Sequence, residues 1–83
     1  MTIHISAKFD NLETAHHASF NYNCIENYVL VNRGLFVNAA IRVLRDKCVN
    51  HFLVDFATMC FVEVYYRDRN GKEIQLFRKE KRK

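Results

Sequence analysis

The sequence predicts a small single α+β domain: a mostly antiparallel sheet, one main amphipathic helix at about residues 35–49 and a C-terminal β-hairpin at about residues 60–78. The chain has 83 residues, which suffices for only one hydrophobic core. Residues 2–9 alternate between polar and apolar, as a half-buried strand does. Asn70-Gly71 separates two further alternating segments, which is a strong hairpin signal. We assign residues 1–77 to the domain and residues 78–83 to a basic C-terminal tail.

The first strand is followed by a weaker helix signal. Ile3, Ile5, Ala7 and Phe9 occupy alternate positions, so this face of the strand is expected to be buried. After the strand, an Asx residue precedes a glutamate by three positions, which has the character of a helix capping box. We therefore expect a short helix from Asn11 to about Ala18.

Residues 19–31 fit two patterns. Polar and apolar residues alternate from Ser19 to Cys24, which predicts a strand. Apolar residues also recur every three or four positions from Leu12 to Tyr28, which would suit one long helix. Because Asn, Ser and aromatic residues are poor helix formers, we favour strands at about 19–24 and 27–31.

A clearer helix follows Asn32-Arg33-Gly34. Its apolar residues share one face, and they are Val37, Ala40, Ile41, Leu44 and Cys48. Asn50 is expected to end this helix in the left-handed conformation. Two alternatives remain for the next segment: residues 52–56 form a short strand, or the helix continues to about Ala57.

Charge pairing selects the turn of the hairpin. A two-residue turn at Asn70-Gly71 would place two like charges, Asp68 and Glu73, opposite each other. A three-residue loop at 69–71, with Gly71 in the left-handed region, instead creates two pairs of opposite charge and is therefore favoured. These pairs are Asp68 with Lys72 and Arg67 with Glu73.

The same register assigns the two faces of the hairpin. It sets Tyr66 across from Ile74 and Val64 across from Leu76. The core face then consists of Val62, Val64, Tyr66, Ile74 and Leu76. The opposite face carries Glu63, Tyr65, Gln75 and Phe77.

Cysteine usage and the absence of apolar spans indicate the compartment. Cys24, Cys48 and Cys60 are odd in number and have no CxxC spacing, so we expect free thiols in a reducing environment. The first residues lack the basic start and apolar run of a signal peptide. No uncharged apolar stretch is long enough to span a membrane. We therefore expect a cytoplasmic, intracellular protein with no membrane partner.

The net charge of +4 is concentrated at the C-terminus. Residues 78–83 hold five basic groups and one acidic group, which leaves eight of each sign in the rest of the chain. A basic tail favours polyanions such as nucleic acid, although a solvated terminus without a partner has the same composition. Together with basic groups and aromatic rings of the hairpin, the tail forms a candidate surface for nucleic acid or a protein partner. Its residues are Arg67, Arg69, Lys72, Arg78, Lys79, Lys81, Arg82, Lys83, Tyr65 and Phe77.

The sequence contains no motif for a metal, a cofactor or a reaction. His16 and His17 are adjacent and therefore point in different directions, and no second ligand pair has the spacing of a structural zinc site. His51 and Asp55 would share a helix face if the helix continued, as a base and its orienting group would. Because no nucleophile motif or phosphate-binding loop accompanies them, we expect no enzyme activity, no metal and no cofactor.

The function that these features favour is a small protein-interaction module, acting as an adaptor or inhibitor of a larger partner. Hydrophobic residues make up 49% of a small chain whose body is neutral, and surplus apolar surface favours burial against another chain. The same surplus favours a homodimer, with a monomer as the alternative. Two other hypotheses are a nucleic-acid-binding protein that uses the tail and hairpin arginines, and a small hydrolase centred on His51 and Asp55.

Overall fold

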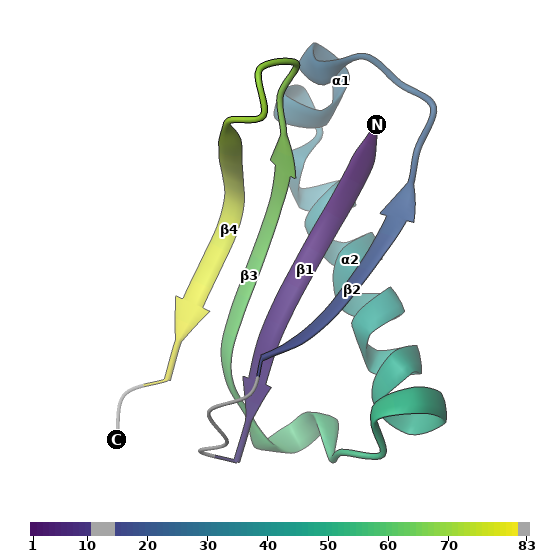
Figure 1. The fold of residues 1–83 in the computed structure, drawn as a ribbon, viewed down its shortest axis with the longest axis vertical. Helices are drawn as coiled ribbons and strands as arrows, with labels where there is room; N and C mark the ends of the chain where they lie inside the picture. Colours follow the sequence, from purple (N-terminus) through teal and green to yellow (C-terminus); the bar gives the residue numbers. More distant parts are fainter. Residues whose placement is uncertain (11–14, 82–83) are drawn as a thin grey trace.

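A computed structural model describes residues 1–10 and 15–81, and it shows an antiparallel sheet with helix α2 packed behind it (Figure 1). The predicted α+β class is confirmed. The strands follow the order β2-β1-β3-β4 across the sheet, and they are β1 (Thr2–Phe9), β2 (His16–Asn21), β3 (Met59–Arg67) and β4 (Glu73–Glu80). The helices are α1 (Glu26–Val31) and α2 (Arg33–Lys47), followed by a π-helical turn (Cys48–Phe52) and a 3-10 turn (Phe56–Thr58). Within the described residues, no helix combines the length and the apolar character needed to cross a membrane.

Strand β1 lies at the centre of the sheet and supplies much of the core. Side chains alternate between the two faces of a strand, so the apolar positions of β1 all point toward α2. The predicted buried face is confirmed, since each of its four side chains is fully buried: Ile3, Ile5, Ala7 and Phe9.

Helix α2 covers the inner face of the sheet with a stripe of apolar residues. Phe36, Val37, Ala40 and Leu44 are buried, and Cys48 continues the stripe into the π-helical turn. The prediction of a helix at 35–49 is therefore confirmed in place, although the helix begins two residues earlier.

The end of this helix differs from the prediction. Leu53, not Asn50, takes the left-handed conformation, with φ 54°. The side-chain amide of Asn50 instead donates to the backbone carbonyl and to the carboxylate of Asp46, at 3.1 and 2.9 Å. These two bonds keep residue 50 inside the helical turn. Both alternatives for the following segment are wrong, because residues 53–55 are irregular and a separate 3-10 turn follows.

The three predictions for residues 11–31 are confirmed only in small part. Residues 11–14 lie outside the described residues, but His16 to Ala18 belong to β2, not to a helix, because they pair with β1. The strand expected at 19–24 is present for residues 19–21, as the last part of β2, and ends at Asn21. The strand expected at 27–31 is wrong, because these residues form helix α1. Here the chain leaves the edge of the sheet for the layer behind it, where a strand would have no neighbour. A helix satisfies its own backbone groups in that position.

The hairpin turn is confirmed as a three-residue loop. Gly71 has φ 81°, and the backbone N–H of Asp68 donates to the carbonyl of Lys72 at 2.9 Å. The Asp68 carboxylate also accepts from the backbone N–H groups of Asn70 and Lys72, both at 2.9 Å. The predicted pairs of Arg67 with Glu73 and of Tyr66 with Ile74 are present.

Beyond these pairs a β-bulge changes the register. Val64 lies opposite Phe77, so the prediction that it faces Leu76 is wrong. A bulge sets two residues of one strand against one of the other, which moves every later side chain to the opposite face. Leu76 is buried as predicted, but Phe77 is partly buried against the core, not on the outer face of the hairpin.

Candidate functional site

Exposed apolar side chains gather around helix α1. The described residues include eight exposed large hydrophobic side chains, and six of these fall within residues 22–35. Ile25 and Val31 are the most exposed of the six, at 72% and 74%. We call this group the apolar cap, and its members are Tyr22, Ile25, Tyr28, Leu30, Val31 and Leu35. Figure 1 places α1 at the end of the molecule where the β3–β4 turn also lies.

The cap follows from the composition of α1. Val29 points into the core, while Tyr28 and Leu30 flank it on either side and Val31 lies further around the helix. Every residue of α1 from Tyr28 onward is apolar, so apolar side chains also lie on the part of the helix that faces away from the core. Tyr22 and Tyr28 both pack edge-on against the buried ring of Phe36, with centroids 5.0 and 5.9 Å away, so the two exposed rings are held in place.

Two surface hollows connect the cap to the hairpin turn. One has a volume of about 370 Å³ and lies between Tyr22, Ile25 and Tyr28. The other has a volume of about 580 Å³, and it shares Ile25 and Cys24 with the first. Its remaining lining residues come from the N-terminus, from α1 and from the β3–β4 turn: Met1, Glu26, Arg67, Asp68, Arg69 and Asn70. The predicted site residues Arg67 and Arg69 therefore lie on the rim of the apolar cap.

The rim carries charges of both signs. Arg67 and Arg69 alternate with Asp68, and Glu26 enters from α1. Burial raises the pKa of Tyr66, and the nearby carboxylate of Glu26 raises it further. An apolar centre surrounded by a polar rim, with arginine enriched, is the usual anatomy of a protein interface.

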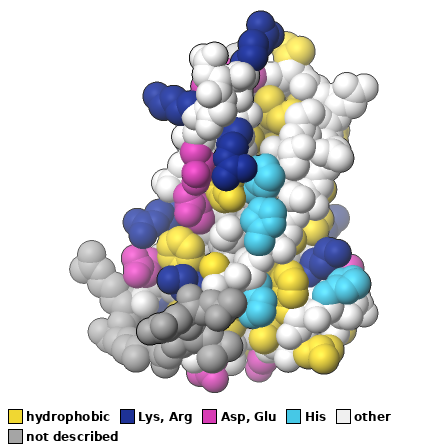
Figure 2. Space-filling view, in the orientation of Figure 1, with side chains coloured by type: hydrophobic (Ala, Val, Ile, Leu, Met, Phe, Trp, Pro, Cys, Tyr) yellow, Lys and Arg dark blue, Asp and Glu magenta, His cyan; other side chains and the backbone are white. Residues whose placement is uncertain are grey.

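The outer face of the sheet is a second candidate surface (Figure 2). Tyr65 lies there as predicted, stacked on His4 with centroids 5.1 Å apart, and the Arg67 guanidinium lies 5.6 Å from its ring. Tyr65 is only 9% exposed as a result. Phe61 lies under two cations, those of Lys8 and Arg78, at 5.9 and 5.4 Å. These covered rings do not form a free platform for stacking nucleic-acid bases, which such proteins present to solvent.

Titratable groups on this outer face affect one another. Burial lowers the pKa of His4, and the neighbouring His17 and Arg67 lower it further, whereas Glu73 opposes the shift. Burial raises the pKa of Glu63, as does the neighbouring Glu73, while Arg78 opposes it. Figure 2 shows histidines near the middle of this face, with basic and acidic side chains around them. The face is therefore mixed in charge and is not a basic surface.

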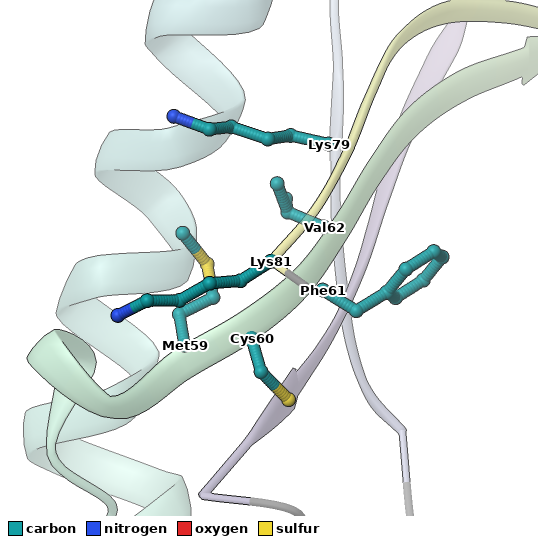
Figure 3. Close-up of a pocket in the computed structure, with 6 residues that line it drawn as sticks. All are labelled: Met59, Cys60, Phe61, Val62, Lys79 and Lys81. Atoms are coloured by element: carbon teal, nitrogen blue, oxygen red, sulfur yellow. The ribbon is translucent and has the colours of Figure 1, made fainter. Parts of the chain in front are cut away.

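The remaining predicted site residues lie at the other end of β4. Lys79 and Lys81 line a groove of about 270 Å³ with Met59 and Val62, and Figure 3 shows both lysines extending in the same direction. Arg78 lies on the outer face, with its guanidinium 3.5 Å from the Glu80 carboxylate. Arg82 and Lys83 lie outside the described residues.

The predicted basic surface is thus divided in two. Arg67, Arg69 and Lys72 lie at the turn of the hairpin, whereas Arg78, Lys79 and Lys81 lie at the far end of β4. The eight residues of β4 span roughly 26 Å between the two groups. One small ligand does not reach both groups.

The candidate hydrolase pair does not come together on a helix. The helical segment ends at Phe52, between His51 and Asp55, so these two residues do not share a helix face. The Asp55 carboxylate accepts from the backbone N–H of Ala57 at 3.0 Å and caps the 3-10 turn.

The histidines are arranged in a way that the sequence alone does not reveal. His16 and His17 point to opposite faces of the sheet, as predicted. His16 stacks on Phe52 on the side of α2, with centroids 4.7 Å apart, while His17 meets His4 on the outer face. Within residues 1–10 and 15–81, no group of three or more His, Cys, Asp or Glu side chains is placed to hold a metal ion.

Comparisons with protein-family models, with curated proteins and with solved structures find no match to this chain. The candidate surfaces are therefore described by their own chemistry. Sequence reasoning missed the apolar cap because residues 27–31 fit a strand. The available signal was that, in a helix, the four consecutive apolar residues 28–31 cannot all face the core.

Proposed function

We propose that this chain is a small protein-interaction module that docks onto another protein through the apolar cap. The observation that supports this proposal is the exposure of six large apolar side chains in one short stretch of the chain. Contiguous apolar patches rimmed by polar groups mark interaction sites on small proteins. Complete burial of a fully exposed side chain of this size contributes roughly 1.5–3 kcal/mol. Ile25 and Val31, which are the most exposed of the six, therefore gain the largest share of this energy on docking.

The charges around the cap favour a protein partner over a lipid surface. A helix that lies on a membrane usually carries lysine and arginine on its polar side. Helix α1 has none, since its only charged residue is Glu26. The rim also supplies both signs, from Arg67 and Arg69 on one side and Glu26 and Asp68 on the other. The matching partner is an apolar protein surface with a rim of mixed charge, on a larger protein or on a second copy of this chain.

A double variant replaces the two most exposed side chains of the apolar cap, Ile25 and Val31, and is designed to keep helix α1 stable. Ile25 is the N-cap residue of α1 and makes no side-chain capping hydrogen bond, so Ile25→Asp supplies a cap that stabilises the helix. The last turn of α1 has no basic residue, so Val31→Lys adds a favourable cation at its C-terminus. The matched control is Val49→Lys, because Val49 is 69% exposed but lies outside the cap.

The test compares three proteins: the natural chain, the Ile25→Asp/Val31→Lys variant and the Val49→Lys control. Sedimentation velocity measures self-association, and capture from an extract of the native host measures binding to other proteins. We expect complexes with the natural chain and the control, and at least a tenfold loss with the double variant. Equal behaviour of all three proteins, or no complex with any of them, would refute the proposal.

Nucleic-acid binding is the second candidate, and the arrangement of Lys79 and Lys81 is what favours it. Both lysines extend in one direction from β4, and the two residues that end the chain are also basic. Residues 78–83 contain five basic groups. If all five contact phosphates, a plot of the logarithm of the binding constant against the logarithm of the salt concentration has a slope of no more than about −4 to −5.

Its test is a titration with single- and double-stranded DNA and RNA at two salt concentrations. The Lys79→Gln/Lys81→Gln variant is expected to bind more weakly at low salt and to reduce the slope by about 2, since each lysine releases about one counterion. Lys72→Gln, at the other end of the hairpin, is the control. Absence of binding at low salt rejects this candidate.

A further inference from the structure

Two histidines meet on the outer face of the sheet. His4 belongs to β1 and His17 to β2, and each lies opposite a serine of the other strand, Ser19 and Ser6. The two histidines are therefore diagonal neighbours on one face. His4 Nδ1 and His17 Nε2 are 3.1 Å apart.

This separation matches that of two nitrogen ligands on one metal ion. With metal–nitrogen bonds of about 2.05 Å, tetrahedral geometry sets two ligand nitrogens about 3.3 Å apart, and adjacent positions of a square-planar ion set them about 2.9 Å apart. The observed distance lies between these two values. Because a hydrogen bond points the two nitrogens at each other, both side chains must rotate before their lone pairs aim at one ion.

The surroundings orient the pair. The ring of Tyr65 stacks on His4 with an angle of 14° between the planes, so the His4 ring is held against the sheet. His17 is exposed and His4 is half-buried, so an ion can reach both rings from solvent. Two charged groups act on His4 in opposite directions, since Arg67 repels a cation and Glu73 attracts it.

We propose that His4 and His17 form a two-ligand site for a divalent transition-metal ion such as Zn²⁺ or Cu²⁺, with water in the other coordination positions. Imidazole is a suitable ligand for these ions. On binding, the proton that one ring donates to the other moves to the remote nitrogen of its own ring, so both imidazoles stay neutral and no proton is released. Because the described residues supply no third ligand, the ion is exchangeable, and the fold does not depend on it.

The test uses the full chain without an affinity tag and titrates ZnCl₂ by calorimetry, with the imidazole resonances followed by NMR. His4→Gln and His17→Gln are each expected to weaken zinc binding at least tenfold. His51→Gln is the matched control, since His51 is an exposed histidine away from the pair. Cys24→Ser tests whether a thiol is the real ligand.

We expect one ion per chain, with shifts of the His4 and His17 resonances that are unchanged in the His51→Gln and Cys24→Ser variants. The proposal is overturned if the natural chain binds no zinc, if binding survives either substitution of the pair, or if Cys24→Ser abolishes it. Far-UV circular dichroism checks that each variant keeps its fold; none of the substituted side chains belongs to the fully buried core.

Discussion

Leu53 and Gly71 both have a left-handed backbone, but only glycine adopts it without cost. Leu53 has φ 54°, and its side chain is 82% exposed, so no burial compensates for the strain. The left-handed region costs an ordinary L-residue about 1 kcal/mol, and asparagine tolerates it better because its side chain bonds locally. The sequence offers an asparagine for this role at position 50, and the chain does not use it.

Leu53→Asn is therefore expected to raise the free energy of unfolding by about 0.5–1 kcal/mol. Urea denaturation measures the change. Leu53→Val is the control, because a β-branched side chain is less suited to the left-handed region and should lower stability. A less stable Leu53→Asn protein would mean that the Leu53 side chain makes contacts that outweigh the strain.

Buried titratable groups make stability depend on pH above neutrality. Burial raises the pKa of the Cys48 thiol above its ordinary value of 9.0, and the pKa of Tyr66 also exceeds its ordinary 10.0. The folded state therefore holds these protons more tightly than the unfolded chain. Their contribution is fully present below about pH 9 and is lost as the pH rises through the unfolded and then the folded pKa.

We expect the free energy of unfolding to fall from pH 9 upward, as measured by urea denaturation at a series of pH values. For each protein, the free energy of unfolding is expressed relative to its own value at pH 8. The decrease of this free energy above pH 9 should be smaller in a Cys48→Ala variant than in the natural chain. An identical pH profile in the two proteins would show that the Cys48 thiol ionises as easily in the fold as in the unfolded chain.

At the scale of elements, local signals were sufficient where the structure depends on local chemistry. The alternation of β1, the apolar stripe of α2 and the turn at Gly71 can all be read from neighbouring residues. The chain from 16 to 31 cannot, because β2 exists by pairing with β1 and α1 forms where the chain leaves the sheet. The bulge lies between the pairs Tyr65–Gln75 and Val64–Phe77, and it is likewise set by packing, which turns Leu76 and Phe77 toward the core together.

The two glycines provide an element-scale prediction. Gly71→Ala should destabilise the hairpin by roughly 1–2 kcal/mol, because φ 81° strains any residue with a Cβ. Gly34→Ala is the matched control: a Cβ there meets nothing within 4 Å, and alanine favours the helix, so stability should rise by up to about 1 kcal/mol. Thermal denaturation distinguishes the two. Equal effects would contradict the turn geometry.

At the scale of the whole molecule, the two helices and four strands of the described residues leave large apolar side chains exposed around α1. The predicted site residues do not form one surface: the arginines of the turn border the apolar cap, while the lysines of β4 lie at the opposite end of the hairpin. Sequence patterns located both groups of charges but could not separate them, because their positions depend on the length and register of β4. The apolar cap depends on the helical conformation of residues 26–31, which the sequence pattern does not predict.

The most direct test of the central claim places a photo-crosslinking side chain in the cap, as Val31→p-benzoylphenylalanine, in the native host. Position 49 carries the same group as a control, because Val49 is almost equally exposed. Docking through the cap predicts a discrete crosslinked adduct from position 31, with a larger protein or a second copy, and none from position 49. The absence of an adduct at position 31, or the same adducts from both positions, would contradict it.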